Sequence, residues 1–508
     1  SIYSLRGCSS NNFNPFIALK RENCNEYAGE VLGFSFVYSG NFLAQVEVDT
    51  YDVTRVMMGI HPHCFSWSLE KGESFQTPEV VMVYSNDGLN KMSQTYHKLY
   101  QRRLARGKYR DQVRPILVNN WEATYFDFDE EKIMDIAGTA QKLGIELFVL
   151  DDGWFGKRNN DVAGLGDWYP NLQKLPSGIS GLSRKINNLG MKFGLWFEPE
   201  MVNKNSDLYR NHPQWILETP NRPSSHGRNQ FVLDFSNPEV VIYVYNMMTE
   251  VIDKANISYI KWDMNRCMTE VYSSCHDSES QGRVMHEYIL GVYQLYELLT
   301  SRFPEILFES CASGGARFDP GMMYYAPQCW TSDDTDALER LKIQYGTSMV
   351  YPVSSLGAHV SAAPNHQLLR NTPIETRANV AYFGTFGYEL DLNKLSMDEQ
   401  IKVKEQITFM KDYREIIQFG TFYRLKSPFE GNETVWMVVS QDQNTAIIGY
   451  YRTLQEVNVG YRRVKLLGLD PDKEYHVNLN NTVHYGDELM NLGLITTDSS
   501  CGENKEKY

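Results

Sequence analysis

A repeated alternation of short apolar runs and amphipathic stretches constrains this chain more than any other feature of its sequence. It extends from about residue 114 to about residue 390. Strands that alternate with helical patterns are typical of βα units in a parallel sheet. The runs that we predict to be strands are 116–121, 147–152, 193–198, 231–234, 259–263, 306–311 and 329–333, with a last one near 350–353 or near 383–387.

Seven or eight βα units in succession fit a (β/α)8 barrel, the TIM barrel, and we predict this fold. The polar residues of these units gather at the C-terminal ends of the apolar runs, which is where a TIM barrel builds its active site. A doubly wound sheet would gather function at the same ends. However, no GxGxxG motif follows a predicted strand, because Gly164-Leu165-Gly166 lies in a predicted loop.

The segments on either side of the barrel are predicted to be rich in strands. At 30–40 and 43–48 the pattern indicates two paired strands with a turn at 39–41, and a helix is expected over 88–106. After a long amphipathic helix at 397–416, alternating segments predict a C-terminal all-β sandwich. We therefore expect a partial N-terminal β-rich domain with a linker helix at 1–110, the catalytic barrel at 111–415 and the sandwich at 416–508.

Charge and cysteine usage exclude several classes of protein. The net charge of −14 argues against nucleic acid or an anionic membrane as partner. No apolar stretch is long enough to span a membrane, and the first residues do not resemble a signal peptide. Eight scattered cysteines, none in a CxxC pair, predict neither a zinc site nor a disulfide scaffold. Reduced thiols in a cytoplasmic protein are the expected arrangement.

Two aspartate-centred segments indicate the chemistry. Asp263 lies in Lys261-Trp262-Asp263-Met264-Asn265-Arg266, and Asp333 lies in Trp330-Thr331-Ser332-Asp333-Asp334-Thr335-Asp336, each where a strand is expected to end. Cleavage of a glycosidic bond needs two carboxyl groups that flank the bond. A single aspartate at a strand end would more often cap the next helix. The aromatic content of 13% is compatible with sugar binding and equally with a rich core.

The residues beside these two aspartates refine the hypothesis. Lys261 precedes Asp263 by two positions, so in a strand both side chains point to the same face, and an ammonium close to a carboxylate keeps it ionised. A structural ion pair is the alternative reading. Composition alone does not choose among Asp333, Asp334 and Asp336; Asp336 suits a helix cap, and Arg340 could pair with Asp334 or Asp336. The adjacent Asp151 and Asp152 could accept hydrogen bonds from sugar hydroxyls or bind a divalent metal.

Several of these segments resemble glycoside hydrolase family 36, the bacterial α-galactosidases, from about residue 10 to the C-terminus. The matching motifs are Asn119-Asn120-Trp121-Glu122-Ala123, Leu150-Asp151-Asp152-Gly153-Trp154, Gly194-Leu195-Trp196-Phe197-Glu198-Pro199-Glu200-Met201, the two aspartate-centred segments, and Cys311-Ala312-Ser313-Gly314-Gly315-Ala316-Arg317-Phe318-Asp319. Members of this family usually carry a larger N-terminal β-supersandwich, of which only the latter part is expected here.

The resemblance implies a role for each matching residue. Asp263 is expected to be the nucleophile and Asp333 the acid/base. The expected substrate-binding residues are Trp121, Asp151, Asp152, Trp196, Arg228, Lys261, Asn265, Cys311 and Gly314. No metal and no cofactor are expected. Cys311 is expected to line the pocket rather than to act as a nucleophile, because no histidine is predicted beside it.

By this resemblance the chain is expected to be a retaining α-galactosidase that acts on terminal α-1,6-galactosides such as melibiose and raffinose. An α-N-acetylgalactosaminidase and an α-galactosyl transferase of the same family are alternatives. A non-catalytic galactoside-binding remnant is an alternative from another class. The expected partners are galactose-containing oligosaccharides, with no nucleic acid and no membrane. A homo-oligomer, such as a tetramer, is expected if the shortened N-terminal domain permits it.

Overall fold

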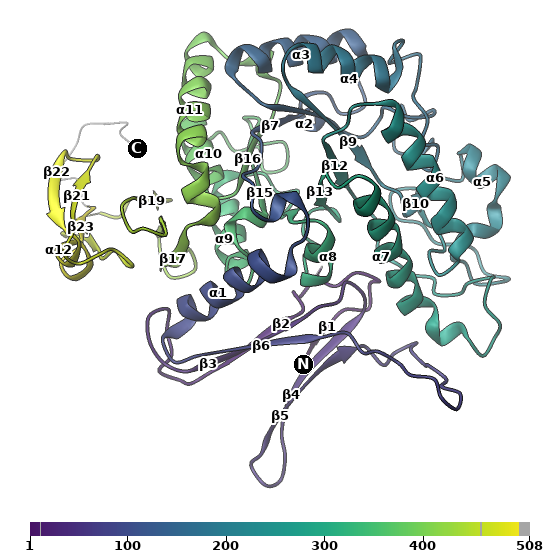
Figure 1. Ribbon diagram of the computed structural model, residues 1–508, viewed down its shortest axis with the longest axis horizontal. Coiled ribbons are helices and arrows are strands. Elements are labelled where there is room, and N and C mark those ends of the chain that lie inside the picture. Colours follow the sequence, from purple (N-terminus) through teal and green to yellow (C-terminus); the bar gives the residue numbers. More distant parts are fainter. Residues whose placement is uncertain (11, 458–459, 497–508) are drawn as a thin grey trace.

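The computed structural model describes residues 1–10, 12–457 and 460–496, and its centre is a closed barrel of eight strands (Figure 1). All eight neighbouring pairs run parallel, and the last strand pairs with the first. The strands are β7 (Leu117–Asn119), β8 (Leu147–Leu150), β9 (Lys192–Phe197), β12 (Tyr259–Trp262), β13 (Leu307–Ser310), β14 (Gln328–Trp330), β15 (Leu356–Ser361) and β16 (Thr385–Glu389). The predicted (β/α)8 barrel is confirmed.

Side chains fill the lower part of the barrel, so the polar residues have room only at the C-terminal ends of the strands. Tyr259 packs in one cluster with Leu117, Leu147 and Leu307, each from the first position of its strand. Every residue of β8 and β12 is buried, as expected for parallel strands with side chains inside and helices outside. Because side chains fill this end of the barrel, we expect the active site at the opposite rim, formed by the C-terminal ends of the strands.

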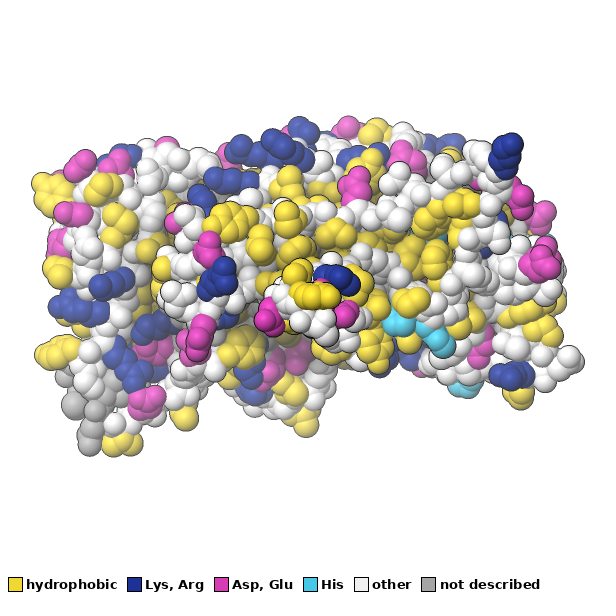
Figure 2. All heavy atoms as spheres, turned by 90° about the horizontal axis from the view of Figure 1, so that it is seen from below, with side chains coloured by type: hydrophobic (Ala, Val, Ile, Leu, Met, Phe, Trp, Pro, Cys, Tyr) yellow, Lys and Arg dark blue, Asp and Glu magenta, His cyan; other side chains and the backbone are white. Residues whose placement is uncertain are grey.

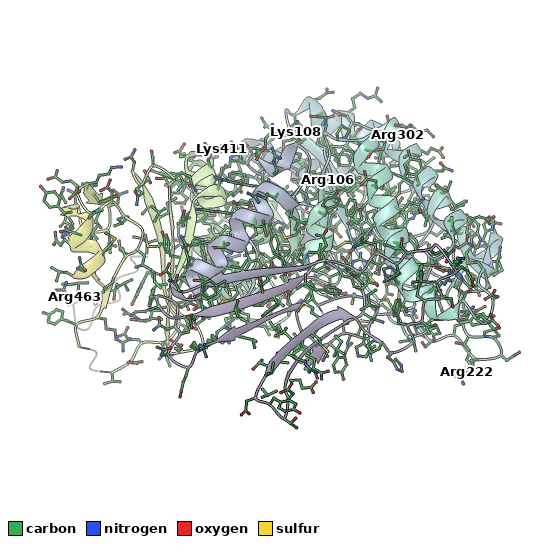
Figure 3. All side chains as sticks on the ribbon, turned by 60° about the horizontal axis from the view of Figure 1, so that its bottom comes forward. Arg106, Lys108, Arg222, Arg302, Lys411 and Arg463 are labelled. Carbon is green, nitrogen blue, oxygen red and sulfur yellow. The ribbon has the colours of Figure 1, made fainter. Side chains whose placement is uncertain are left out.

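Several outer helices begin at a side chain that accepts a hydrogen bond from the first backbone N–H groups. Asp129 accepts a hydrogen bond from the backbone of Lys132 at the start of α3, and Ser396 forms a capping box with Glu399 at the start of α11. These helices are α2 (Trp121–Thr124), α3 (Glu130–Leu143), α4 (Gly178–Asn188), α5 (Asp207–Asn211), α6 (Pro238–Lys254), α7 (Val284–Arg302), α8 (Pro320–Tyr325), α9 (Ala337–Thr347), α10 (Ile374–Ala381) and α11 (Met397–Phe419). Lys411 of α11 also donates to the carbonyl of Gly144 after α3 (Figure 3).

One predicted barrel strand is wrong, and one of the two positions offered for the last strand is not a strand. The run 231–234 gives β11 (Phe231–Val232), which pairs antiparallel with β10 (Met201–Val202) outside the barrel. The run 350–353 is not a strand either, and β15 follows it at Leu356–Ser361. A short apolar run does not indicate which strand it pairs with. It can pair with a neighbouring barrel strand or with a strand in an excursion, a segment that leaves the barrel between two of its strands. The alternative position near 383–387 does hold a strand, β16.

The N-terminal strands form two antiparallel sheets. One contains β2 (Phe16–Lys20), β3 (Val31–Phe36) and β6 (Val80–Ser85); the other contains β1 (Ile2–Tyr3), β4 (Phe42–Val48) and β5 (Thr54–Ile60). The expected pairing of 30–40 with 43–48 is therefore wrong, because β3 and β4 lie in different sheets. The turn between them moves the chain from one sheet to the other.

A helix connects these sheets to the barrel, as predicted. It begins as α1 (Gly88–Leu99) and continues as a π-helical turn at Tyr100–Leu104. The segment that follows is fastened to the barrel by two ion pairs, Arg106 with Glu297 of α7 at 2.7 Å and Lys108 with Glu305 at 2.5 Å (Figure 3).

The C-terminal part is built of small sheets beside α11 (Figure 1). Its core contains Val435, Met437, Val464 and Leu489. One short helix, α12 (Gly486–Asn491), is added to the predicted strands. The strands are β17 (Thr421–Lys426), β18 (Glu433–Val439), β19 (Ala446–Arg452), β20 (Arg463–Val464), β21 (Glu474–Val477), β22 (Thr482–Tyr485) and β23 (Leu494–Ile495).

The contact of α7 with the loop before α6 makes a prediction. A Cβ added to Gly291 in α7 would lie 2.0 Å from the carbonyl oxygen of Phe235, so Gly291→Ala should destabilise the protein by about 1–3 kcal/mol. Gly138 in α3 is the matched control, because a Cβ there meets no atom within 4 Å. Gly138→Ala should stabilise by about 1 kcal/mol through helix propensity. Urea and thermal denaturation of both variants test this, and equal shifts would contradict it.

Candidate active site at the barrel rim

The C-terminal ends of the barrel strands place the predicted site residues around one rim. Lys261 lies in β12 and Asp263 follows it, Asp151 follows β8, and Asp333 comes after β14. Trp196 lies in β9, Cys311 follows β13 and Trp121 begins α2 directly after β7, whereas Arg228 lies in the excursion between β10 and β11.

Asp263 is surrounded by N–H donors. Its Oδ1 accepts from the backbone of Met264 at 2.8 Å and of Ser313 at 3.2 Å. Its Oδ2 accepts from Asn265 Nδ2 at 2.8 Å and from Trp196 Nε1 at 3.3 Å. Hydrogen bonds to a carboxylate favour its charged form and fix its orientation. Asp263 is therefore held in one orientation by four N–H donors.

Lys261 interacts with the charge of Asp263, but its ion pair is with another carboxylate. Its Nζ forms an ion pair with Asp151 Oδ2 at 2.9 Å, across the intervening strand β9. Burial lowers the pKa of Lys261, but the carboxylates of Asp151 and Glu389 outweigh burial and hold it well above its usual value. Strand periodicity correctly placed Lys261 and Asp263 on one face, but it carries no information about a partner on another strand.

The adjacent aspartates have different partners. Asp151 Oδ2 also accepts from Asn119 Nδ2 at 2.6 Å, and burial raises the pKa of Asp151 while Lys261 opposes that rise. Asp152 is held by the buried Arg158, whose Nε and Nη2 donate to it at 3.0 and 2.9 Å. In the described part of the chain, no three His, Cys, Asp or Glu side chains are grouped as a metal ion requires.

Asp333 has a different environment from Asp263. Burial raises the pKa of Asp333 to about 6, the negative charge of Asp263 adds to the rise, and Lys261 opposes it. Its Oδ1 accepts a hydrogen bond from Trp330 Nε1 at 3.1 Å. A buried carboxyl group whose pKa is raised is suited to act as an acid, whereas a carboxylate held by N–H donors is suited to act as a nucleophile.

Asp334 and Asp336, which follow Asp333, stabilise the main chain around α9. Asp336 caps α9 by accepting from the backbone of Leu338 and Glu339 at 3.0 and 3.1 Å, and it pairs with Arg370. Asp334 Oδ1 accepts from the backbone of Asp336 at 3.0 Å. The expected pairing of Arg340 with one of these carboxylates is wrong, because Arg340 Nε donates to the backbone carbonyl of Asp334.

The loop after β13 packs directly against Asp333. Gly314 has a φ of +82°, and a Cβ there would lie 2.7 Å from both the backbone nitrogen of Asp333 and the Cα of Ser332. Only glycine fits this approach without displacing the backbone that carries Asp333. Cys311 in the same loop is buried, and burial raises the pKa of its thiol, with smaller contributions from the charges of Asp263 and Asp333. The charges of both carboxyl groups therefore act on Cys311.

Trp121 begins α2 after β7, and Arg228 lies in the excursion between β10 and β11. The half-buried ring of Trp121 meets Tyr125 and Phe126 edge to face, with ring centres 5.1 and 5.3 Å apart. Burial raises the pKa of Glu198 to about 8, the charge of Asp263 adds to this, and Arg228 opposes it. The charge of Arg228 thus acts on the carboxyl next to Asp263.

Sequence reasoning gave no role to four further carboxylates at the rim. Glu198 accepts from the backbone of Asn265 and from Gln230 Nε2. Glu389 ends β16 and pairs with His359 Nδ1 at 3.1 Å. Burial raises the pKa of Glu122 to about 8, with a contribution from Glu389. The sequence offered one indication of a role for Glu198, Glu122 and Glu389. Each of them lies at or just after the end of a predicted strand.

The fourth carboxylate, Glu200, is fully buried. Arg317 Nη1 and Nη2 donate to it at 2.9 and 2.7 Å. Trp262 Nε1 and the hydroxyl of Tyr288 donate as well, at 2.8 and 2.6 Å. Glu200 thereby connects the end of β12, directly before Asp263, to the loops after β9 and β13.

Comparison with known proteins identifies the family. The Melibiase family matches residues 74–420, and the N-terminal and C-terminal domains of glycosyl hydrolase family 36 match residues 1–70 and 433–504. Alpha-galactosidase AgaA of Geobacillus stearothermophilus is 59% identical over 97% of this chain and 67% of its own length, and alpha-galactosidase Mel36A of Lactobacillus acidophilus is 49% identical over the same shares.

Solved structures agree with this assignment. The crystal structure of AgaA superposes with a TM-score of 0.97 over 98% of this chain and 69% of that protein. The α-galactosidase from Lactobacillus brevis gives the same TM-score at 51% identity, over 99% of this chain and 68% of its own. The chain therefore spans about two thirds of the length of these relatives. By sequence and by fold, this chain belongs to glycosyl hydrolase family 36.

Proposed function

We propose that this chain is a retaining α-galactosidase in which Asp263 is the nucleophile and Asp333 is the acid/base. The observation that carries the proposal is the contrast between the two carboxyl groups. Asp263 is held by four N–H donors, and Asp333 is buried with a pKa raised to about 6, so that it can carry a proton. The negative charge of Asp263 acts on Asp333, which supports a shared site for the two groups.

The reaction has two steps. In the first, a carboxylate oxygen of Asp263 attacks the anomeric carbon, the bond from this carbon to the aglycone oxygen breaks, and Asp333 gives its proton to that oxygen. In the second, Asp333 takes a proton from water, the water oxygen attacks the anomeric carbon, and the bond to Asp263 breaks. Two inversions retain the α-configuration.

Two further observations support the substrate and the roles. The charged pair Asp151 and Lys261 offers an acceptor and a donor for neighbouring sugar hydroxyls. Variants of AgaA have been crystallised with raffinose and with stachyose, and the aspartates substituted in those two variants are separated by the same number of residues as Asp263 and Asp333. The proposed substrates are terminal α-1,6-galactosides, including melibiose and raffinose, with Trp121, Asp152, Arg228, Asn265, Cys311 and Gly314 also at the sugar site.

The proposal includes a homo-oligomer. Figure 2 shows hydrophobic side chains spread over the face on which the N-terminal strands lie. Val48 and Met57 of the sheet that contains β4 and β5 are 61% and 46% exposed, and Met82 and Tyr84 of β6 in the other sheet are 62% and 57% exposed. Exposed apolar patches commonly mark contact surfaces. Light scattering of the purified chain measures the number of subunits, and a monomer at all concentrations would contradict this part.

The proposed location is the cytoplasm. The cysteines in the described part of the chain form no disulfide bond with one another, as is usual in a reducing compartment. The eighth cysteine of the sequence, Cys501, lies outside the described residues. No helix among the described residues is long and apolar enough to cross a membrane.

Azide tests the two catalytic roles. Asp263→Ala should lose several orders of magnitude in rate, and azide should restore turnover by attacking from the face that the carboxylate occupied, giving the β-galactosyl azide.

Asp333→Ala should release the aryl group from p-nitrophenyl α-galactoside far more readily than glucose from melibiose, and azide should give the α-galactosyl azide. Asp334→Ala is the matched control. If it shows the signature expected of Asp333→Ala, the acid/base assignment is wrong.

Proton NMR tests the stereochemistry. The first sugar released from p-nitrophenyl α-galactoside should be α-galactose, which then mutarotates to the β-anomer. Added methanol should intercept the covalent intermediate and give methyl α-galactoside. If β-galactose is released first, the reaction inverts the anomeric centre and the proposed double displacement is excluded.

The pH dependence follows from the pKa of Asp333. The acid must be protonated in the free enzyme, so kcat/KM for raffinose should fall as the pH rises through about 6. α-Galactosyl fluoride provides the control, because fluoride leaves with little protonation and its profile should lack this decline. A decline at the same pH with both substrates would assign it to another group.

A further inference from the structure

The segment 331–334 that carries Asp333 is held mainly by the guanidinium of Arg340 in α9, and Gln367 Nε2 adds one hydrogen bond to the carbonyl of Asp333 at 2.7 Å. Arg340 is 3% exposed. Its Nε donates to the carbonyl of Asp334 at 2.7 Å, and its Nη2 donates to the carbonyl of Ser332 at 2.6 Å. These carbonyls belong to the residues directly before and after Asp333. Nη1 donates to the carbonyl of Gly357 in β15 at 2.8 Å and to the hydroxyl of Thr331.

The same guanidinium supports the ring that contacts the carboxyl group. Arg340 Cζ lies 4.5 Å from the ring centre of Trp330, and Trp330 Nε1 donates to Asp333 Oδ1 at 3.1 Å. The ring of His359 lies 4.5 Å from the Trp330 ring, and Glu389 fixes His359 in turn. Because Oδ1 accepts this hydrogen bond, the transferable proton of the acid belongs on Oδ2.

We infer that Arg340 and Trp330 are the positioning residues of the proton donor: Arg340 fixes the main chain on both sides of Asp333, and Trp330 turns its carboxyl group so that Oδ2 faces the glycosidic oxygen. This inference rests on the proposed function, because it requires Asp333 to be the acid/base. Neither residue exchanges a proton or an electron pair with the substrate.

The geometry of the guanidinium, rather than its charge, carries this role. A guanidinium presents its N–H groups in one rigid plane, and here they reach carbonyls two residues apart together with β15. Lysine has the same charge but presents it as a point on a flexible stem. The causes that set the pKa of Asp333 are burial first, then Asp263, Lys261, Glu389 and the hydrogen bond from Trp330.

Misplacement of the acid affects substrates unequally. A sugar leaving group needs its proton at the transition state, whereas p-nitrophenolate leaves with little help. Displacement of a catalytic group by about 1 Å can cost on the order of 10²-fold in rate. Loss of the Arg340 contacts should therefore lower kcat for melibiose on the order of 10²-fold, and should lower kcat for p-nitrophenyl α-galactoside only a few-fold.

The experiment compares Arg340→Lys and Arg340→Met on these two substrates in the full chain. Arg377→Met is the matched control. Arg377 is also a buried arginine, 6% exposed, and it donates to the backbone carbonyls of Thr372 at 2.9 Å and of Ser361 beside the next barrel strand. We expect both Arg340 variants to show the selective loss, with KM for melibiose changed much less than kcat. The Arg377 variant should slow the two substrates by equal factors.

Two outcomes overturn the inference. The first is an equal loss on both substrates in the Arg340 variants, which indicates a purely structural role. The second is full activity of Arg340→Lys on melibiose, which shows that charge alone is required. If neither Arg340 variant folds, Trp330→Phe decides, since it removes the hydrogen bond to Oδ1 while keeping an aromatic ring. It should show the same selective loss, and an equal loss on both substrates overturns the inference.

The proposed function fails in a different way. A parent chain that releases galactose from neither substrate would contradict the proposed function itself. A parent chain that is active on both, with variants that lose the two activities equally, contradicts only the positioning role of Arg340 and Trp330.

Discussion

The buried ion pair between Arg317 and Glu200 is the interaction on which the rest of the site depends. Both side chains are excluded from water, with 1% and 0% exposure, and the loss of hydration is offset by two N–H···O bonds and by further donors from Trp262 and Tyr288. This pair fastens the loop after β13 to the loop after β9 and to the end of β12. The main chain at Asp263 therefore has its position before any substrate arrives.

Besides this ion pair, contacts to the main chain position the two carboxyl groups as much as contacts between charged side chains do. The backbone of Ser313 donates to Asp263, and Gly314 in the same loop packs against the backbone of Asp333. Arg340 holds the other side of the Asp333 segment. Loops that follow two different strands thus set the positions of the two carboxyl groups relative to each other. A barrel rim suits this arrangement, because the ends of neighbouring strands meet there.

The barrel and its rim could be predicted from the sequence because both depend on local pattern. Apolar runs that end in polar residues place Asp151, Asp263 and Asp333 after strands, wherever the helices lie. The partners of Lys261 and Arg340 could not be predicted, because each partner lies on another strand or is a backbone carbonyl that sequence does not distinguish. The same limit explains the errors at 231–234 and at β3 and β4, where the strands exist but pair differently.

The electrostatic repulsion between Asp263 and Asp333 has a consequence for the second half of the proposed reaction. Part of the raised pKa of Asp333 comes from the negative charge of Asp263. Once Asp263 is esterified by the sugar, that charge is gone, and Asp333 loses one of the causes that kept its proton in place. It has just given this proton to the departing aglycone and now has less tendency to regain one from solvent. The carboxylate is then available to activate water. Formation of the covalent intermediate thus favours the deprotonated form of Asp333. No conformational change is needed to convert this residue from an acid into a base.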